Sequence, residues 1–194
     1  MKVRAFPLLL ALSALFLAAC GTYMPQRYSI SADNNVALRS IGAANINVGP
    51  FKGDESFDPA CRGGSRGVSW WISTGMAVSI DLPDGMSFEA YIQKALADEL
   101  KVAGIFNEKS PKVTLTGVVE HLDFSTTSSS YWDIVLRVNS SIGTSTLVRE
   151  HYEFPYAFAG TTACQNAADA FPRTVQDLIG KLVKSPDFKA LVTP

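Results

Sequence analysis

Apolar residues recur with helical spacing in two segments of the chain. Residues 87–103 carry a stripe that Gly104 ends, and residues 166–184 carry a second stripe, in which Pro172 is expected to interrupt the first part. The first stripe consists of Phe88, Ile92, Ala95, Leu96, Leu100 and Ala103, and the second of Phe171, Val175, Leu178, Ile179, Leu182 and Val183. The pattern therefore predicts two amphipathic helices, each with one buried face. Ser185-Pro186 predicts a short further turn that runs through Leu191.

Strands are predicted before the first helix and between the two helices. Residues 45–51 form the first expected strand, and residues 68–80 form a hairpin or one bulged strand divided at Gly75. Residues 113–124 form a long strand in which Val113, Leu115 and Val119 point one way and Leu122 and Phe124 the other. This change of phase predicts a bulge or a twist near Gly117. Residues 131–142 and 144–154 are expected to form a hairpin about Gly143.

The order of strands, helix, three strands and helix predicts an α+β fold. Two amphipathic helices placed in this order are expected to pack on one face of a single, mostly antiparallel sheet. Residues 21–40 are polar, rich in turn-forming residues and without sustained periodicity. We therefore expect residues 20–40 to be a flexible tether and residues 41–194 to be a single domain.

The N-terminus has the organisation of an export signal. Lys2 and Arg4 precede an apolar run over 6–19, which is too short for a spanning helix. The run ends in Leu17-Ala18-Ala19-Cys20, which resembles the lipobox of bacterial lipoproteins. This resemblance implies that residues 1–19 are a signal peptide and that Cys20 becomes the lipid-bearing first residue. An ordinary signal cleaved near Ala19 and an uncleaved anchor are the alternatives.

The lipobox also implies a location. Several acyl chains on Cys20 would hold the mature protein on a bilayer permanently. Gly21, rather than aspartate, follows the cysteine. By analogy with lipoprotein sorting in enterobacteria, we expect the protein in the outer membrane, facing the periplasm.

Charge and cysteine content narrow the function further. The chain has 17 basic and 18 acidic residues and no basic run, which argues against a nucleic-acid partner. Once Cys20 is lipidated, Cys61 and Cys164 remain as a pair in an oxidising compartment, so a disulfide is expected between them. Two unpaired buried thiols are the alternative. Cys61 and Cys164 lie too far apart in the sequence to form the Cys-x-x-Cys motif of a redox or zinc site.

The sequence offers little evidence for a catalytic site. His121 and His151, each preceded by a glutamate (Glu120, Glu150), would form a metal site or an acid/base pair only if their strands met in a suitable register. The serines of 128–130 have no base nearby in the sequence, and no hydrolase or phosphate-loop motif is present. We therefore expect a protein without catalytic activity and without a cofactor. A hydrolase is the alternative.

Binding residues are expected in a glycine-rich loop and the strand that follows it. Arg62 and Arg66 are candidates for contact with anionic lipid head groups or a partner. Trp70 and Trp71 are adjacent on a predicted strand and so face opposite sides, which leaves one free for a contact or for stacking on a carbohydrate.

Part of the sequence is similar to a recurring piece of small bacterial envelope lipoproteins. In those proteins a helix like residues 88–103 ends in a motif like Ala103-Gly104-Ile105-Phe106 and leads into a strand like Val113–Gly117. Lipopolysaccharide-assembly lipoproteins and auxiliary lipoproteins of ABC-type transporters are examples. The resemblance implies a non-catalytic accessory in envelope assembly or in lipid or ABC-type transport, with an envelope protein or lipid as partner. A peptidoglycan- or glycan-binding module is the alternative, because of Trp70 and Trp71.

Overall fold

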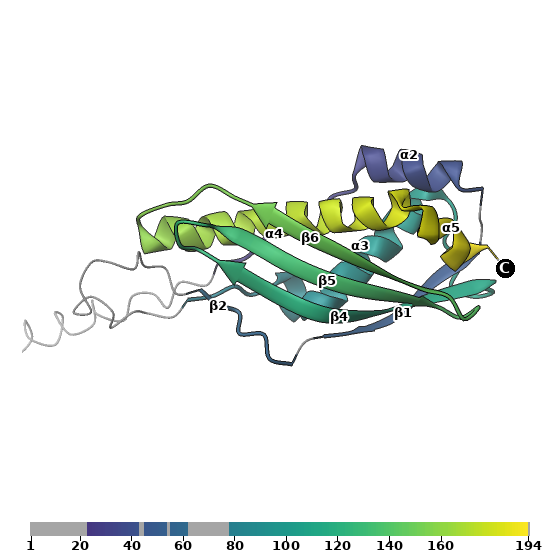
Figure 1. Cartoon of the computed structure of the whole chain (residues 1–194), viewed down its shortest axis with the longest axis horizontal. Coiled ribbons are helices and arrows are strands. Elements are labelled where there is room, and N and C mark those ends of the chain that lie inside the picture. The colour runs from purple at the N-terminus through teal and green to yellow at the C-terminus, as the bar shows by residue number, and fades with distance from the viewer. Residues whose placement is uncertain (1–22, 43–44, 54, 62–77, 194) are drawn as a thin grey trace, which may run out of the picture.

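A four-stranded mixed sheet forms the centre of the molecule (Figure 1). The structure is a computed structural model and describes residues 23–42, 45–53, 55–61 and 78–193. The sheet contains, in spatial order, β1 (Ile46–Lys52), β4 (Val113–Ser125), β5 (Tyr131–Ser140) and β6 (Ser145–Glu153). β4, β5 and β6 are antiparallel, whereas β1 pairs with β4 in parallel. The predicted α+β fold with a mostly antiparallel sheet is therefore confirmed.

Helices cover one face of this sheet (Figure 1). α3 (Phe88–Ala103) packs on β1 and β4, and α4 (Gly160–Lys184) packs on β5 and β6. α2 (Ala32–Ser40) lies on both of these helices, and α5 (Pro186–Val192) contacts β5 and β6. The remaining elements are the short antiparallel pair β2 (Ala60–Cys61) and β3 (Val78–Ser79) and one 3-10 turn, η2 (Pro83–Gly85). No helix in the described ranges is both long enough and apolar enough to cross a bilayer.

The ends of α3 follow directly from its sequence. The Ser87 side chain accepts a hydrogen bond from the backbone N–H of Ala90, which caps the first turn. Gly104 adopts a left-handed conformation with φ 78°, which ends the helix at low steric cost. The predicted apolar stripe is buried, apart from the partly exposed Ala103, so this element is confirmed with its boundaries.

The bulge in β4 lies at a different position from the predicted one. The register with β5 shifts between Val119 and His121, so both Glu120 and His121 are exposed. The extra residue reverses the alternation, and Leu122 consequently stays on the helix-covered face instead of turning away. Gly117 has another role. A Cβ atom there would come within 2.6 Å of the Phe51 ring, so glycine allows this ring to pack directly on the backbone of β4.

α4 begins earlier than the sequence predicts and continues through Pro172. It starts at Gly160 instead of residue 166 and ends at Lys184 as expected. A proline in a helix interior removes one backbone hydrogen bond, but Phe171 and Val175 on either side of it are fully buried. Packing of this apolar face against the sheet therefore outweighs the local preference for a break.

Residues 23–40 belong to the folded domain, so the prediction of a tether is wrong for this segment. Tyr28 donates a hydrogen bond from its hydroxyl to Glu99 Oε1 at 2.7 Å, and the backbone N–H of Ser31 donates to the same oxygen at 2.8 Å. Asn34 Nδ2 donates to the carbonyl of Gln176 at 2.9 Å. Burial and the bond to Glu99 raise the pKa of Tyr28. These partners are distant in sequence, which is why local periodicity gave no indication of them.

An aromatic cluster around Trp132 joins the layers. Trp132 is fully buried and stacks on Phe124 at a centroid distance of 4.7 Å, and it contacts Phe171 of α4 at 4.9 Å. Phe88 of α3 and Phe57 are also part of the cluster. The Trp132 indole N–H donates to the carbonyl of Ala167 at 2.8 Å. One side chain thus links β5 to β4 and to both long helices.

The expected disulfide is confirmed. Cys61 of β2 and Cys164 in the second turn of α4 are bonded, with their Cα atoms 5.8 Å apart, and both residues are buried. The bond ties the small β2–β3 pair to the start of α4.

Candidate functional site

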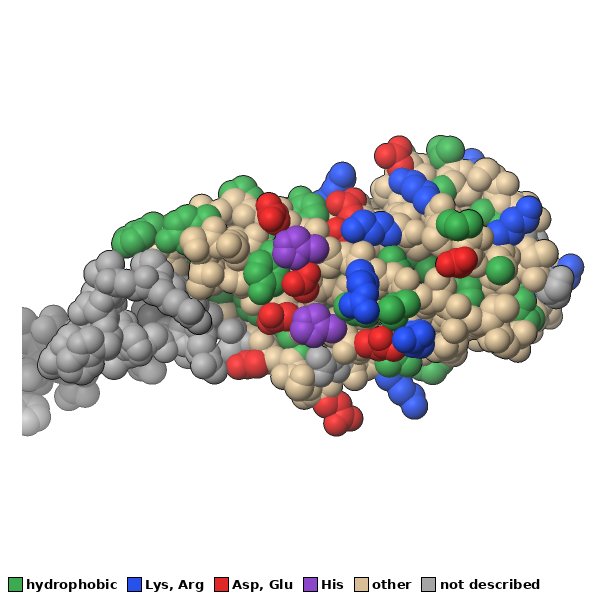
Figure 2. All heavy atoms as spheres, in the orientation of Figure 1, with side chains coloured by type: hydrophobic (Ala, Val, Ile, Leu, Met, Phe, Trp, Pro, Cys, Tyr) green, Lys and Arg blue, Asp and Glu red, His purple; other side chains and the backbone are tan. Residues whose placement is uncertain are grey.

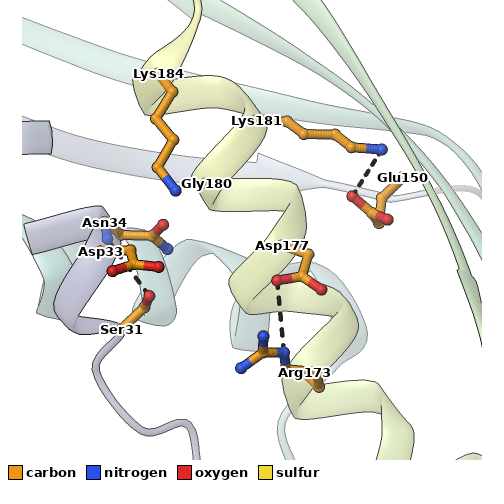
Figure 3. A pocket seen from close by; sticks show the side chains of 9 residues that line it. All are labelled: Ser31, Asp33, Asn34, Glu150, Arg173, Asp177, Gly180, Lys181 and Lys184. Carbon is orange, nitrogen blue, oxygen red and sulfur yellow. Dashed lines mark hydrogen bonds and ion pairs between the residues drawn. The ribbon is translucent and has the colours of Figure 1, made fainter.

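A charged groove of about 450 Å³ lies between α2, α4 and β6. Figure 3 shows the side chains that line it: Ser31, Asp33, Asn34, Glu150, Arg173, Asp177, Gly180, Lys181 and Lys184. A Cβ atom on Gly180 would lie 2.8 Å from Asn34 Oδ1, so glycine at this position permits the close approach of α2 to α4. The groove is therefore a consequence of how α2 packs, which the sequence did not predict.

The charges in the groove are balanced. Lys181 Nζ lies 3.1 Å from Glu150 Oε2, and Arg173 Nε lies 3.6 Å from Asp177 Oδ1 (Figure 3). Glu150 is only 5% exposed; burial raises its pKa, and the nearby Lys181 ammonium partly opposes this shift. Three basic and three acidic side chains line the groove, so its net charge favours neither an anion nor a cation. The groove therefore supports no particular ligand.

Glu150 gives this groove a testable dependence on pH. Its folded-state pKa lies above its unfolded value, so the buried carboxyl group stabilises the fold less as the pH rises through the raised pKa. We expect the Glu150→Gln variant, which does not titrate, to gain stability relative to the wild type between about pH 4 and about pH 8. Urea unfolding at both pH values measures this difference.

The Lys181→Met variant is the matched comparison. It removes the cation that lowers the pKa of Glu150, so its stability should fall more steeply with rising pH than that of the wild type. Stability curves that run parallel for wild type and Glu150→Gln would contradict the assignment.

The second candidate surface is the face of the sheet that the helices leave open. Figure 2 shows histidine, acidic and basic side chains gathered on the face that the strands present in Figure 1. Asp123, Asp133 and His151 lie opposite one another across β4, β5 and β6. His151 Nδ1 is 2.6 Å from Asp133 Oδ1, and this hydrogen bond raises the pKa of the histidine. Nearby, Arg137 Nε donates to Glu120 Oε1 at 2.5 Å.

The two histidines and their glutamates do not form one site. His121 lies on β4, opposite Val135 of β5, and His151 lies on β6. Strand β5 therefore separates the two histidines. Glu150 is buried on the opposite face, next to α4, because neighbouring residues of a strand point to opposite sides. Within the described ranges, no group of three histidine, cysteine, aspartate or glutamate residues is arranged to hold a metal ion.

The other predicted site residues are distributed as follows. Ser130 is buried and donates a hydrogen bond from its hydroxyl to the carbonyl of Thr127 at 2.8 Å, which is a turn-stabilising contact. The lipidation site and the candidate contact residues lie outside the described residues: Cys20, Arg62, Arg66, Trp70 and Trp71.

One surface feature was not predicted, although an uncharged run in the sequence indicates it. Residues 154–168 include no acidic, basic or histidine residue. In the structure, Tyr156 and Phe158 of this run are 43% and 68% exposed, on the loop between β6 and α4. Two exposed aromatic rings on an uncharged loop are typical of a contact surface.

Comparison with one solved structure supports the fold. The crystal structure of protein XCC0632 from Xanthomonas campestris, assigned to the DUF330 family, is similar with a TM-score of 0.51 and 10% sequence identity, over 84% of this chain and 95% of that chain. The crystal structure of an uncharacterized protein gives a TM-score of 0.45 and 11% identity, over 84% of this chain and 99% of that chain. No family model matches the chain, and no curated protein matches it. The likeness to XCC0632 concerns architecture alone.

Proposed function

We propose that this chain is a lipoprotein of the outer membrane that faces the periplasm and acts as a non-catalytic accessory in envelope assembly or in lipid or ABC-type transport. The observation that carries the proposal is the lipobox-like Leu17-Ala18-Ala19-Cys20 after an apolar run with a basic start. The Cys61–Cys164 disulfide supports it, because disulfides persist in exported proteins and are rare in reducing compartments.

A binding role is supported by how the surfaces are used. The apolar stripes of α3 and α4 are buried in the core, so these stripes are not free for a partner. The open face of the sheet offers the exposed Val118 and Leu147 on either side of Arg137, together with the paired charges around Asp133. A mixed surface of this kind suits a protein partner, and the similarity of residues 88–117 to envelope lipoproteins supports the same role.

The Cys20→Ser variant tests the anchor. A hydroxyl group does not replace the thiol that accepts the lipid, so this variant should leave the membrane fraction and lack the mass of the acyl chains. Detergent-phase partition and intact-mass measurement of the protein provide the readout. An unchanged mass and unchanged partition would refute the proposal.

The Gly21→Asp variant is the matched control. It keeps the lipidated cysteine but, by the same sorting analogy, should move the protein from the outer-membrane to the inner-membrane fraction of a sucrose gradient. Wild-type protein in the inner-membrane fraction would contradict the proposed location while leaving the anchor intact.

A further inference from the structure

The start of the described chain determines which end of the domain would meet the membrane. The backbone N–H of Tyr23 donates to the carbonyl of Ser79 at 3.3 Å, and the N–H of Asp81 donates to the carbonyl of Tyr23 at 3.1 Å. Tyr23 is thus part of the folded domain. Only three residue steps separate it from Cys20, and a chain of that length spans at most about 11 Å. A lipid on Cys20 would therefore hold the Tyr23 end of the domain against the bilayer.

A chain of contacts connects Tyr23 to the loop between β6 and α4. Ser79, its hydrogen-bond partner, pairs with Ala60 beside Cys61, and the disulfide joins Cys61 to α4. Asn166 of α4 donates from its side chain to the carbonyl of Pro155 in the loop at 2.9 Å. Figure 1 shows β2 and the first turns of α4 at one end of the long axis, and α5 and the C-terminus at the opposite end. The loop thus lies at the end that carries Tyr23.

The loop between β6 and α4 suits contact with lipid. The loop 154–159 has no charged residue, and it exposes Phe158 and Tyr156. The neighbouring β4–β5 turn, 126–130, consists only of threonine and serine, and its Ser130 carbonyl accepts a hydrogen bond from the N–H of Phe154. Tyrosine is enriched at the head-group level of a bilayer, and phenylalanine occurs on the apolar face of segments that lie in this interface.

We propose that the loop 154–159 is a second membrane contact, in which the Phe158 ring enters the boundary between head groups and acyl chains and Tyr156 lies at the head-group level. The occupant of this surface is the bilayer that holds the lipid on Cys20, so the inference rests on the proposed function. The lipid anchor and the aromatic loop together orient the domain with its long axis directed away from the membrane and its α2 and α5 end farthest from it.

Site-specific photocrosslinking tests this contact in the full-length chain expressed in a bacterial host. Phe158→p-benzoylphenylalanine is illuminated in intact membranes, and phospholipid adducts on the purified protein are quantified by mass spectrometry. The control is Val36→p-benzoylphenylalanine, because Val36 is 70% exposed on α2 at the opposite end. Since burying an aromatic side chain in an apolar environment shifts an equilibrium by about tenfold or more, lipid adducts at position 158 should exceed those at position 36 by roughly tenfold.

The same sample separates this inference from the proposed function. Acylated Cys20 together with equal lipid adducts at positions 158 and 36 would overturn the membrane contact and leave the proposed lipoprotein intact. Adducts at position 158 that join only protein, whether another chain or residues 62–77 of the same chain, would also overturn it. An unmodified Cys20 would overturn the proposed function and this inference with it. Both replaced side chains are exposed, so neither substitution disturbs the core.

Discussion

The double variant Cys61→Ala/Cys164→Ala is expected to lose about 4–5 kcal/mol of unfolding free energy relative to the oxidised wild type. The bond joins residues 103 positions apart, so it restricts most of the unfolded chain. In the chain-entropy account, a loop of this length gives a larger stabilisation than a short one, because a longer loop removes more conformations from the unfolded state. For a domain of this size, the loss corresponds to a fall in melting temperature of roughly 8–20 °C.

Thermal and urea unfolding of the detergent-solubilised protein measure this effect. The oxidised wild type, unfolded without reductant, should show no reactive thiol at either position. Reduction of the wild type should lower its stability to that of the double variant. A double variant within about 1 kcal/mol of the wild type would show that the bond adds little to what the core already provides.

The Trp132→Ala variant is expected to destabilise the fold by about 3–5 kcal/mol, the usual cost of truncating a large buried aromatic residue. Trp132 is completely buried and contacts side chains from β4, α3 and α4, so its removal leaves a cavity where these layers meet. It also removes the donor to the carbonyl of Ala167, a contact that contributes about 1 kcal/mol.

Two further variants separate these contributions. Trp132→Phe keeps an aromatic ring but loses the indole N–H, so its stability should lie between that of the wild type and that of Trp132→Ala. Val36→Ala truncates an exposed apolar residue on α2 and should change the stability by no more than about 0.5 kcal/mol. A Trp132→Ala variant as stable as Val36→Ala would contradict the central position of this residue in the core.

The parts of the fold that were correctly predicted share one property: their signal is local. α3 has its cap, its stripe and its terminal glycine within 18 consecutive residues, Ser87–Gly104. The β5–β6 hairpin turns at Gly143, which has a φ of 89°, a conformation that glycine adopts readily. Cys61 and Cys164 were paired correctly because processing at Cys20 would leave no other cysteine.

The candidate surfaces were less predictable because they depend on contacts between distant segments. The groove exists because Gly180 admits α2, and α2 itself has only a weak helical stripe. His121 and His151 were correctly identified as strand residues, but the pairing of β4, β5 and β6 decides that they do not meet. The exposure of Phe158 depends on where the loop after β6 lies relative to α4.

By itself, the sequence determined the α+β class, the periodic helices and strands, and the pairing of the cysteines, because hydrophobic periodicity and turn residues act over a few positions. The tertiary structure alone decided the parallel pairing of β1 with β4, the position of the bulge at His121 and the attachment of residues 23–40 to Glu99 and Gln176. The bonds of residues 23–40 join residues up to 147 positions apart. No local pattern predicts such contacts, since the chain entropy lost in joining distant residues is offset by the packing of the whole core.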